Sequence, residues 1–351
     1  MLSFWNTVAY NRLIRKQDIG QLRPFMKGDY IMNSIERFYA TVERKPVDRP
    51  ACWMGDPTPE AVPGLCKEFG VDNIKDLKRV CGDDFYAVEI PYHSEHCNAI
   101  FAAFDWYMNG SNVDTEHRTL TAAGCFAQCE DLEDVEAVNY PWPDPEKYID
   151  PELCRQLVDE APKDKVVMGM LWACHFQDFC AAFGMQTCLM NMVAEPEMVH
   201  YVDDHIVAFY EKALKIFLEA TKGKVHAVLI GDDMGSQRGL MISPALIKEF
   251  VIPGAKRLID ICHSYGVKVM YHSCGSIVDA IPLLIEAGVD IIHPIQALAV
   301  GMDPANLKAK FEGQVCFCGG VDTQDLLPNG TPEQVAAKVK ELRGYFPTGL
   351  I

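Results

Sequence analysis

The sequence lacks an unbroken run of about 18 apolar residues, the length at which a helix can span a membrane. It also lacks the succession of basic, apolar and small residues that marks a secretory signal peptide. The two absences predict a cytoplasmic protein that does not bind membranes. Basic residues are comparatively few, 32 against 49 acidic ones, and the net charge of −17 disfavours nucleic acid and anionic lipid as partners.

Two further absences concern disulfides and nucleotides. The chain has 14 cysteines but no signal peptide, so we expect reduced thiols instead of a disulfide framework. Most of them, such as Cys154, Cys188 and Cys262, lie in helical patterns and are interpreted as small core residues. No glycine-rich fingerprint follows the first apolar run, which makes a doubly wound nucleotide-binding sheet the weaker alternative for the fold.

From Asp48 onward, short apolar runs alternate with long amphipathic segments. This alternation predicts α/β architecture, with a parallel sheet covered by helices. Seven runs are found, and an eighth begins at 348–351, where the sequence stops, so we predict a (β/α)₈ TIM barrel with its last strand cut short. The runs are 51–54, 85–90, 166–172, 225–230, 267–271, 289–293 and 315–318, and the best-defined helices are expected within 244–266, 276–288, 303–313 and 331–346.

We expect residues 32–351 to form a single barrel domain with an insertion at about 94–150. The insertion contains a stretch that alternates like a hairpin, 113–128, and a proline-rich loop at 139–148. Residues 1–31 are interpreted as an N-terminal extension that is not native, with translation starting at Met32. A genuine N-terminal helix is the alternative.

The most informative motif is His272-Ser-Cys274, which follows the apolar run 267–271. Residues two apart on a strand point the same way, so the imidazole and the thiol are expected to project together. A nitrogen and a sulfur aimed at one place suit a metal such as zinc. The alternative is a packed cysteine beside a loop histidine.

In a barrel of this kind the reacting groups lie at the C-terminal ends of the strands. Asp232 and Asp233 are predicted to be catalytic, orienting substrate or accepting a proton; a helix cap and a salt bridge are the alternative. Five residues are predicted to bind substrate, although aromatic residues near strand ends are often core: Tyr92, Trp172, His175, Gln237 and Arg238. Weaker candidates at other strand ends are His93, His293, Gln296 and Asp322.

Five stretches resemble the uroporphyrinogen decarboxylase superfamily: DRP at 48–50, GDD at 231–233, SPALIKEFVIPGAKRLID at 243–260, HSCGSI at 272–277 and GGVDTQDLLPNGTPEQV at 319–335. The likeness covers roughly residues 33–351 and is greatest to the branch of zinc-dependent, corrinoid-linked methyltransferases. It implies the same barrel, with zinc held by His272, Cys274 and a third ligand. That third ligand is predicted to be Cys318, or else a residue beyond Ile351.

The resemblance implies an enzyme that moves a methyl group between a small thiol or methoxy compound and a corrinoid. The corrinoid (methylcobalamin) would be carried by a partner protein that docks transiently. One alternative is decarboxylation of a tetrapyrrole, which the sequence disfavours because a substrate with eight carboxylates needs several arginines and the chain has 12. The other is a non-catalytic, ligand-binding member of the family.

Overall fold

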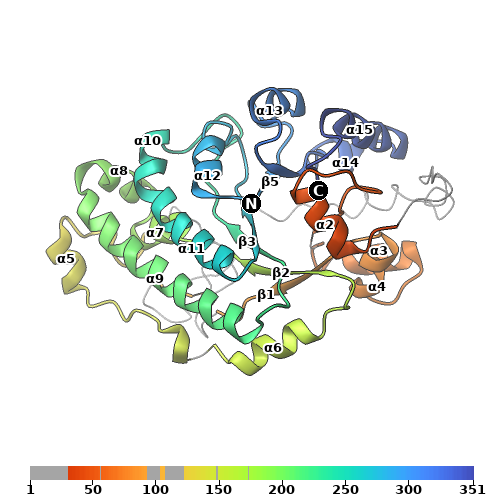
Figure 1. Cartoon of the computed structure of the whole chain (residues 1–351). Helices are drawn as coiled ribbons and strands as arrows, with labels where there is room; N and C mark the ends of the chain where they lie inside the picture. The colour runs from red at the N-terminus through yellow and green to blue at the C-terminus, as the bar shows by residue number, and fades with distance from the viewer. Residues whose placement is uncertain (1–30, 56, 93–102, 107–121, 148, 173) are drawn as a thin grey trace. The chain divides into compact units, whose positions relative to one another are not determined.

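The computed structural model describes residues 31–55, 57–92, 103–106, 122–147, 149–172 and 174–351 (Figure 1). Residues 1–30 of the predicted N-terminal extension, His93 and most of the predicted hairpin at 113–128 lie outside these residues. Within them the chain forms two compact units. The first contains the residues up to Phe85 together with Lys163–Val166 and Pro294–Ile351, and the second contains Tyr86–Pro162 and Val167–His293.

In the described part of the chain, six strands form one sheet in sequence order. They are β1 (Phe85–Glu89), β2 (Val166–Leu171), β3 (Ala227–Gly231), β4 (Lys268–His272), β5 (Ile291–Ile295) and β6 (Cys316–Gly319). The pairs β2–β3, β3–β4 and β4–β5 are parallel. Every residue of β2 and β3 is buried, as expected for parallel strands covered on both faces, and the predicted α/β class is confirmed.

Six of the seven apolar runs thus become strands within the described residues, with bounds shifted by up to two residues. Residues 51–54 differ, since they are not a strand, although the Asp84 N–H donates to the Cys52 carbonyl at 2.8 Å. At the predicted eighth position, Phe317 and Leu350 form a parallel β-bridge, and the Ile351 N–H donates to the Phe317 carbonyl at 2.8 Å. The end of the chain therefore pairs in the manner expected of a strand.

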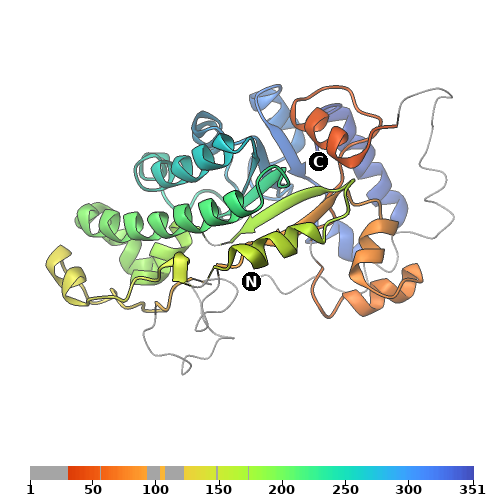
Figure 2. The same cartoon turned by 60° about the horizontal axis from the view of Figure 1, so that its bottom comes forward.

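The second unit is mainly helical around its strands. Its longest helix, α9 (Pro196–Ala220), lies alongside α11 (Ile252–Ser264), as Figure 1 and Figure 2 show. The turn of π-helix η2 (Ile247–Val251) precedes Pro253, which has no N–H to continue the regular hydrogen-bond pattern. The other elements are α5 (Leu132–Ala137), η1 (Pro145–Lys147), α6 (Pro151–Asp159), α7 (Phe176–Phe183), α8 (Met185–Ala194), α10 (Pro244–Leu246), η2 (Ile247–Val251) and α12 (Ile281–Ala287).

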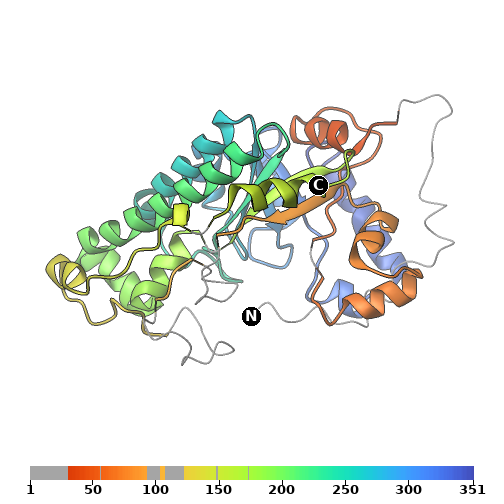
Figure 3. The same cartoon turned by 90° about the horizontal axis from the view of Figure 1, so that it is seen from below.

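The first unit contains α2 (Ser34–Val42), α3 (Val62–Phe69), α4 (Ile74–Val80), α13 (Pro304–Phe311), α14 (Leu326–Asn329) and α15 (Pro332–Tyr345). Helices α3 and α4 pack together as the orange pair in Figure 3. Both α2 and α15 begin with a capping box, in which Asn33 and Thr331 exchange hydrogen bonds with the residue three positions later. No helix in the described part of the chain is long and apolar enough to cross a membrane.

Asp48 and Arg49 of the DRP motif take part in a network of ion pairs in the first unit. The Asp84 carboxylate is fully buried and pairs with Arg37 at 2.8 Å and with Arg49 at 2.6 Å. Arg37 also bonds to Asp48 at 2.7 Å, and both of these side chains are nearly buried. Removing one partner from such a network leaves an uncompensated buried charge, so the motif is held by its ion pairs within the unit.

Candidate metal centre

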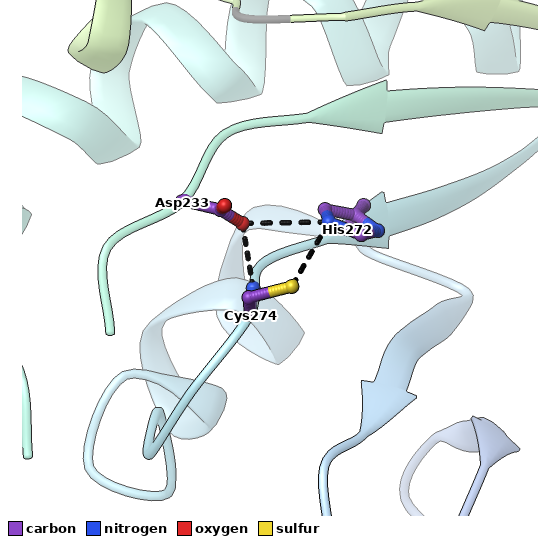
Figure 4. A group of neighbouring side chains, drawn as sticks. All are labelled: Asp233, His272 and Cys274. Carbon is purple, nitrogen blue, oxygen red and sulfur yellow. Dashed lines mark hydrogen bonds and ion pairs between the residues drawn. The ribbon is translucent and has the colours of Figure 1, made fainter. Parts of the chain in front are cut away.

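The ends of β3 and β4 bring the predicted metal ligands together. Gly231 and His272 are partners in the parallel register, so the segments that follow the two strands leave the sheet side by side. Figure 4 shows the side chains of Asp233, His272 and Cys274 converging there. His272 Nε2 lies 3.4 Å from Cys274 Sγ and 3.4 Å from Asp233 Oδ1, and one candidate ligand atom from each residue lies within 4.8 Å of the others.

Backbone hydrogen bonds tie these two segments to each other. The Cys274 N–H donates to Asp233 Oδ1 at 2.7 Å, and the Met234 N–H donates to the Ser273 hydroxyl at 2.9 Å. The Asp233 N–H in turn donates to Gln177 Oε1 at 3.0 Å. These hydrogen bonds therefore fix the backbone of Asp233 and Cys274 and the position of the Asp233 carboxylate.

Gly275 follows the cysteine and makes a close backbone approach possible. Its φ of +87° lies in the left-handed region that favours glycine. A Cβ atom there would lie 2.6 Å from the Gly235 carbonyl carbon and 2.7 Å from the Ser236 carbonyl oxygen. The loop after β4 can pack on the turn after β3 only because this residue has no side chain.

The three groups are electrostatically coupled. Burial opposes a charge on Asp233, but its hydrogen bond to His272 and the imidazolium charge hold the pKa of this carboxyl below its usual value. Burial alone would lower the pKa of His272, whereas its hydrogen bonds to Asp233 and Cys274 raise it to about 10. Next to it, burial and the charge of His272 hold the pKa of His293 well below its usual value.

The donor set fits a zinc ion. Imidazole nitrogen, thiolate sulfur and carboxylate oxygen are the three protein ligand types that zinc takes, and three protein ligands with an open position are typical of a catalytic site. Among the described residues, Asp233, His272 and Cys274 form a group of side chains close enough together to hold a metal ion. We therefore add Asp233, which the sequence predicted as catalytic, to the candidate ligands.

Cys318 is the third ligand predicted from the sequence. It lies on β6 in the first unit and is buried. Burial, with Cys316 and Cys52 nearby, raises the pKa of this thiol well above its usual value. Its part in metal binding stays a prediction.

Asp232, the neighbour of Asp233, is directed elsewhere. Its carboxylate is fully buried and accepts from the N–H groups of Phe176 at 3.2 Å and Gln177 at 3.1 Å, which form the first turn of α7. The Tyr271 hydroxyl donates to it at 3.4 Å. Burial raises the pKa of this carboxyl to about 7. The geometry corresponds to the helix-cap interpretation, because the carboxylate of Asp232 accepts from the first turn of α7.

Two of the predicted substrate-binding residues lie in the interior. His175 is fully buried just before α7, with a positive φ of 38° and with Nδ1 3.1 Å from Asp203 Oδ1. Tyr92 is also fully buried, and its hydroxyl accepts from the Trp172 N–H at 2.8 Å. Both arrangements favour a supporting role in the interior over direct contact with a substrate.

Trp172 lies against His272 of the candidate metal centre. Its ring meets His272 edge-on, with the ring centroids 5.4 Å apart at an interplanar angle of 80°. It is half-buried, at the end of β2. Gly231 makes room for it, because a Cβ there would lie 2.7 Å from Trp172 Cε3. The glycine of the GDD motif thus sets where the indole packs.

We expect Gly231→Ala to destabilise the protein by about 1–3 kcal/mol, because the added methyl overpacks the Trp172 ring. Gly239→Ala is the matched control, since a Cβ at Gly239 meets nothing within 4 Å. Urea unfolding of the two variants measures the difference. Equal stabilities would contradict the close packing described here.

The remaining candidates lie in an exposed turn of the second unit or in the first unit. Gln237 and Arg238 are exposed in a tight turn, where Gly235 and Leu240 form an antiparallel bridge. Asp322, in the first unit, accepts from the N–H groups of the three residues 324–326 and so organises the turn before α14. Gln296 belongs to the first unit and is half-buried.

Residues 33–346 match the family described as uroporphyrinogen decarboxylase (URO-D), and the chain belongs to this family. A relative, the methylated-thiol–coenzyme M methyltransferase of Methanosarcina mazei, is 27% identical over 151 residues, which are 42% of this chain and 36% of the relative. A solved structure described as a methyltransferase from Methanosarcina mazei has a TM-score of 0.54 and 16% identity, covering 90% of this chain and 99% of that chain. This likeness, together with the family, confirms the predicted fold.

Proposed function

We propose that the protein is a zinc-dependent methyltransferase, which moves a methyl group between a small thiol or methoxy compound and a corrinoid on a partner protein. The observation that carries the proposal is the convergence of His272, Cys274 and Asp233 at the ends of β3 and β4. The name of the curated relative, which refers to a methylated thiol and a methyltransferase, supports the choice of reaction. The sequence likeness itself covers less than half of either chain.

His272 and Cys274 would hold the ion, with Asp233 as the third donor from the described residues. When bound, zinc would withdraw charge from the reacting atom, keeping a substrate thiol deprotonated or weakening the basicity of a leaving alkoxide. Trp172 would form an apolar wall beside the imidazole and limit the access of water. The Gln177 amide oxygen accepts from the Asp233 N–H, so the carboxylate keeps its place beside His272 Nε2.

The decarboxylase alternative finds little support, because most arginines in the described residues are already paired with carboxylates. A tetrapyrrole with several carboxylates requires unpaired guanidinium groups around the site. Eight of the 12 arginines lie in the described residues, and five of these eight form ion pairs with carboxylates. Those five are Arg37, Arg49, Arg79, Arg155 and Arg257.

The test is methyl transfer in both directions with a methylated corrinoid protein. We expect the methylcobalamin absorbance to disappear only when the right small acceptor is present, and a methoxylated donor to methylate the reduced corrinoid. The partner is expected to release after each turnover, through an interface of about 1,200 Å² or less. If a broad panel of thiols and methoxy compounds gives no transfer while uroporphyrinogen loses CO₂, the decarboxylase alternative replaces the proposal.

A further inference from the structure

We propose that His293 is a positioning residue for the metal centre, which fixes the imidazole tautomer that His272 needs to bind the ion. The inference rests on the proposed function and deepens it. His272 Nδ1 and His293 Nδ1 lie 2.9 Å apart, which is a hydrogen-bond distance. The Nε2 atom of His272, on the other side of the ring, faces Cys274 Sγ and Asp233 Oδ1.

The direction of this hydrogen bond decides whether His272 can be a ligand. A neutral imidazole carries one proton, on either Nδ1 or Nε2. If His272 Nδ1–H donates to His293 Nδ1, the lone pair of Nε2 points toward the thiol and the carboxylate. If His293 donates instead, the proton of His272 must sit on Nε2, where it blocks the ion. Histidine ligands of metals usually donate their second N–H to an outer partner, and we assign that acceptor role to His293 Nδ1.

The strands place His293 for this role. His272 and His293 are directly paired in the parallel register of β4 and β5. The Ser273 N–H donates to the His293 carbonyl at 2.8 Å, which fixes the backbone at the same level. Pro294 follows, and a residue before proline is confined to extended backbone, so the strand conformation at His293 is favoured locally as well.

The ring contact is consistent with a single fixed arrangement. The centroids of the two imidazoles are 4.9 Å apart with an interplanar angle of 48°. His272 also meets Trp172 edge-on. The His272 ring is therefore held by one histidine and one indole while Nε2 remains directed at the other two donors.

His293→Leu removes the acceptor and keeps an apolar side chain, whereas His293→Asn keeps an oxygen acceptor near the position of Nδ1. We expect zinc affinity, measured by competition with a chromophoric chelator, to fall about 10- to 100-fold in the leucine variant. The asparagine variant should retain zinc affinity within about threefold of the native protein. With cobalt as a spectroscopic substitute for zinc, the ligand-field bands should shift in the leucine variant and be restored in the asparagine variant.

His226→Leu is the matched control. The His226 ring also accepts a backbone hydrogen bond, from the Val167 N–H at 3.0 Å, but it lies before β3, at the other end of the strand from Asp233. This variant should lose stability and keep its zinc affinity. Nitrogen NMR of the zinc-loaded native protein, labelled at histidine, should show the His272 proton on Nδ1.

Two results overturn the inference: native zinc affinity with an unchanged cobalt spectrum in His293→Leu, or a His272 proton on Nε2 in the loaded protein. Failure of the proposed function looks different. In that case His272→Ala would itself retain zinc, or the native protein would bind zinc as described and transfer no methyl group. The two failures are therefore distinguishable from the same set of proteins.

Discussion

Replacing Cys274 by alanine is expected to reduce bound zinc from close to one ion per chain to a small fraction of that. Zinc sites of four ligands bind with about 10–16 kcal/mol, so each ligand contributes about 3 kcal/mol, or about 10²-fold in Kd. Loss of the thiolate removes the only sulfur among the three converging donors. Elemental analysis of the purified variant, with circular dichroism to confirm its fold, measures the effect.

The matched control is Cys262→Ala, which makes the same change in the core. Cys262 is fully buried in α11, so this variant should lose stability through a small cavity while its zinc content remains native. Methyl transfer should be lost with the metal in Cys274→Ala and retained in the control. Native zinc content in Cys274→Ala would place the metal site elsewhere in the chain.

The pairing of His272 with Cys274 could be predicted because it depends on a local rule. Side chains two residues apart at a strand end point the same way, and no knowledge of the rest of the fold is needed. The contribution of Asp233 to the same cluster could not be predicted in this way. It depends on the register that sets Gly231 opposite His272, and the sequence does not state that register.

The alternation of strands and helices was predicted for a similar reason, since apolar runs and helical periodicity are local signals. The capping boxes at Asn33 and Thr331 are local signals too. The directions of His175 and Tyr92 are not, because loop residues after a strand can point into the core or toward the strand ends. Here Asp203 and the Trp172 backbone supply their partners in the interior.

Substitution by asparagine is expected to affect different properties at the adjacent carboxylates: zinc affinity at Asp233 and protein stability at Asp232. Asp233→Asn should weaken zinc binding about 10²-fold, because a neutral amide replaces a charged ligand. The size of the effect again corresponds to the loss of one ligand, about 3 kcal/mol. Methyl transfer at limiting zinc should fall by at least as much. Asp232→Asn should keep zinc affinity close to native, because this side chain caps α7 and does not face the other donors.

The cost of Asp232→Asn should appear in stability instead. Its carboxylate satisfies two buried N–H groups of α7, and an amide that satisfies only one of them leaves the other unpaired, at about 1–3 kcal/mol. Chelator competition and urea unfolding on both variants, with Cys318→Ala alongside, separate the possible third ligands. Zinc lost only in Cys318→Ala would assign the third position to that thiol, and the carboxylate of Asp233 would then act on the substrate, since it remains within 3.4 Å of His272 Nε2.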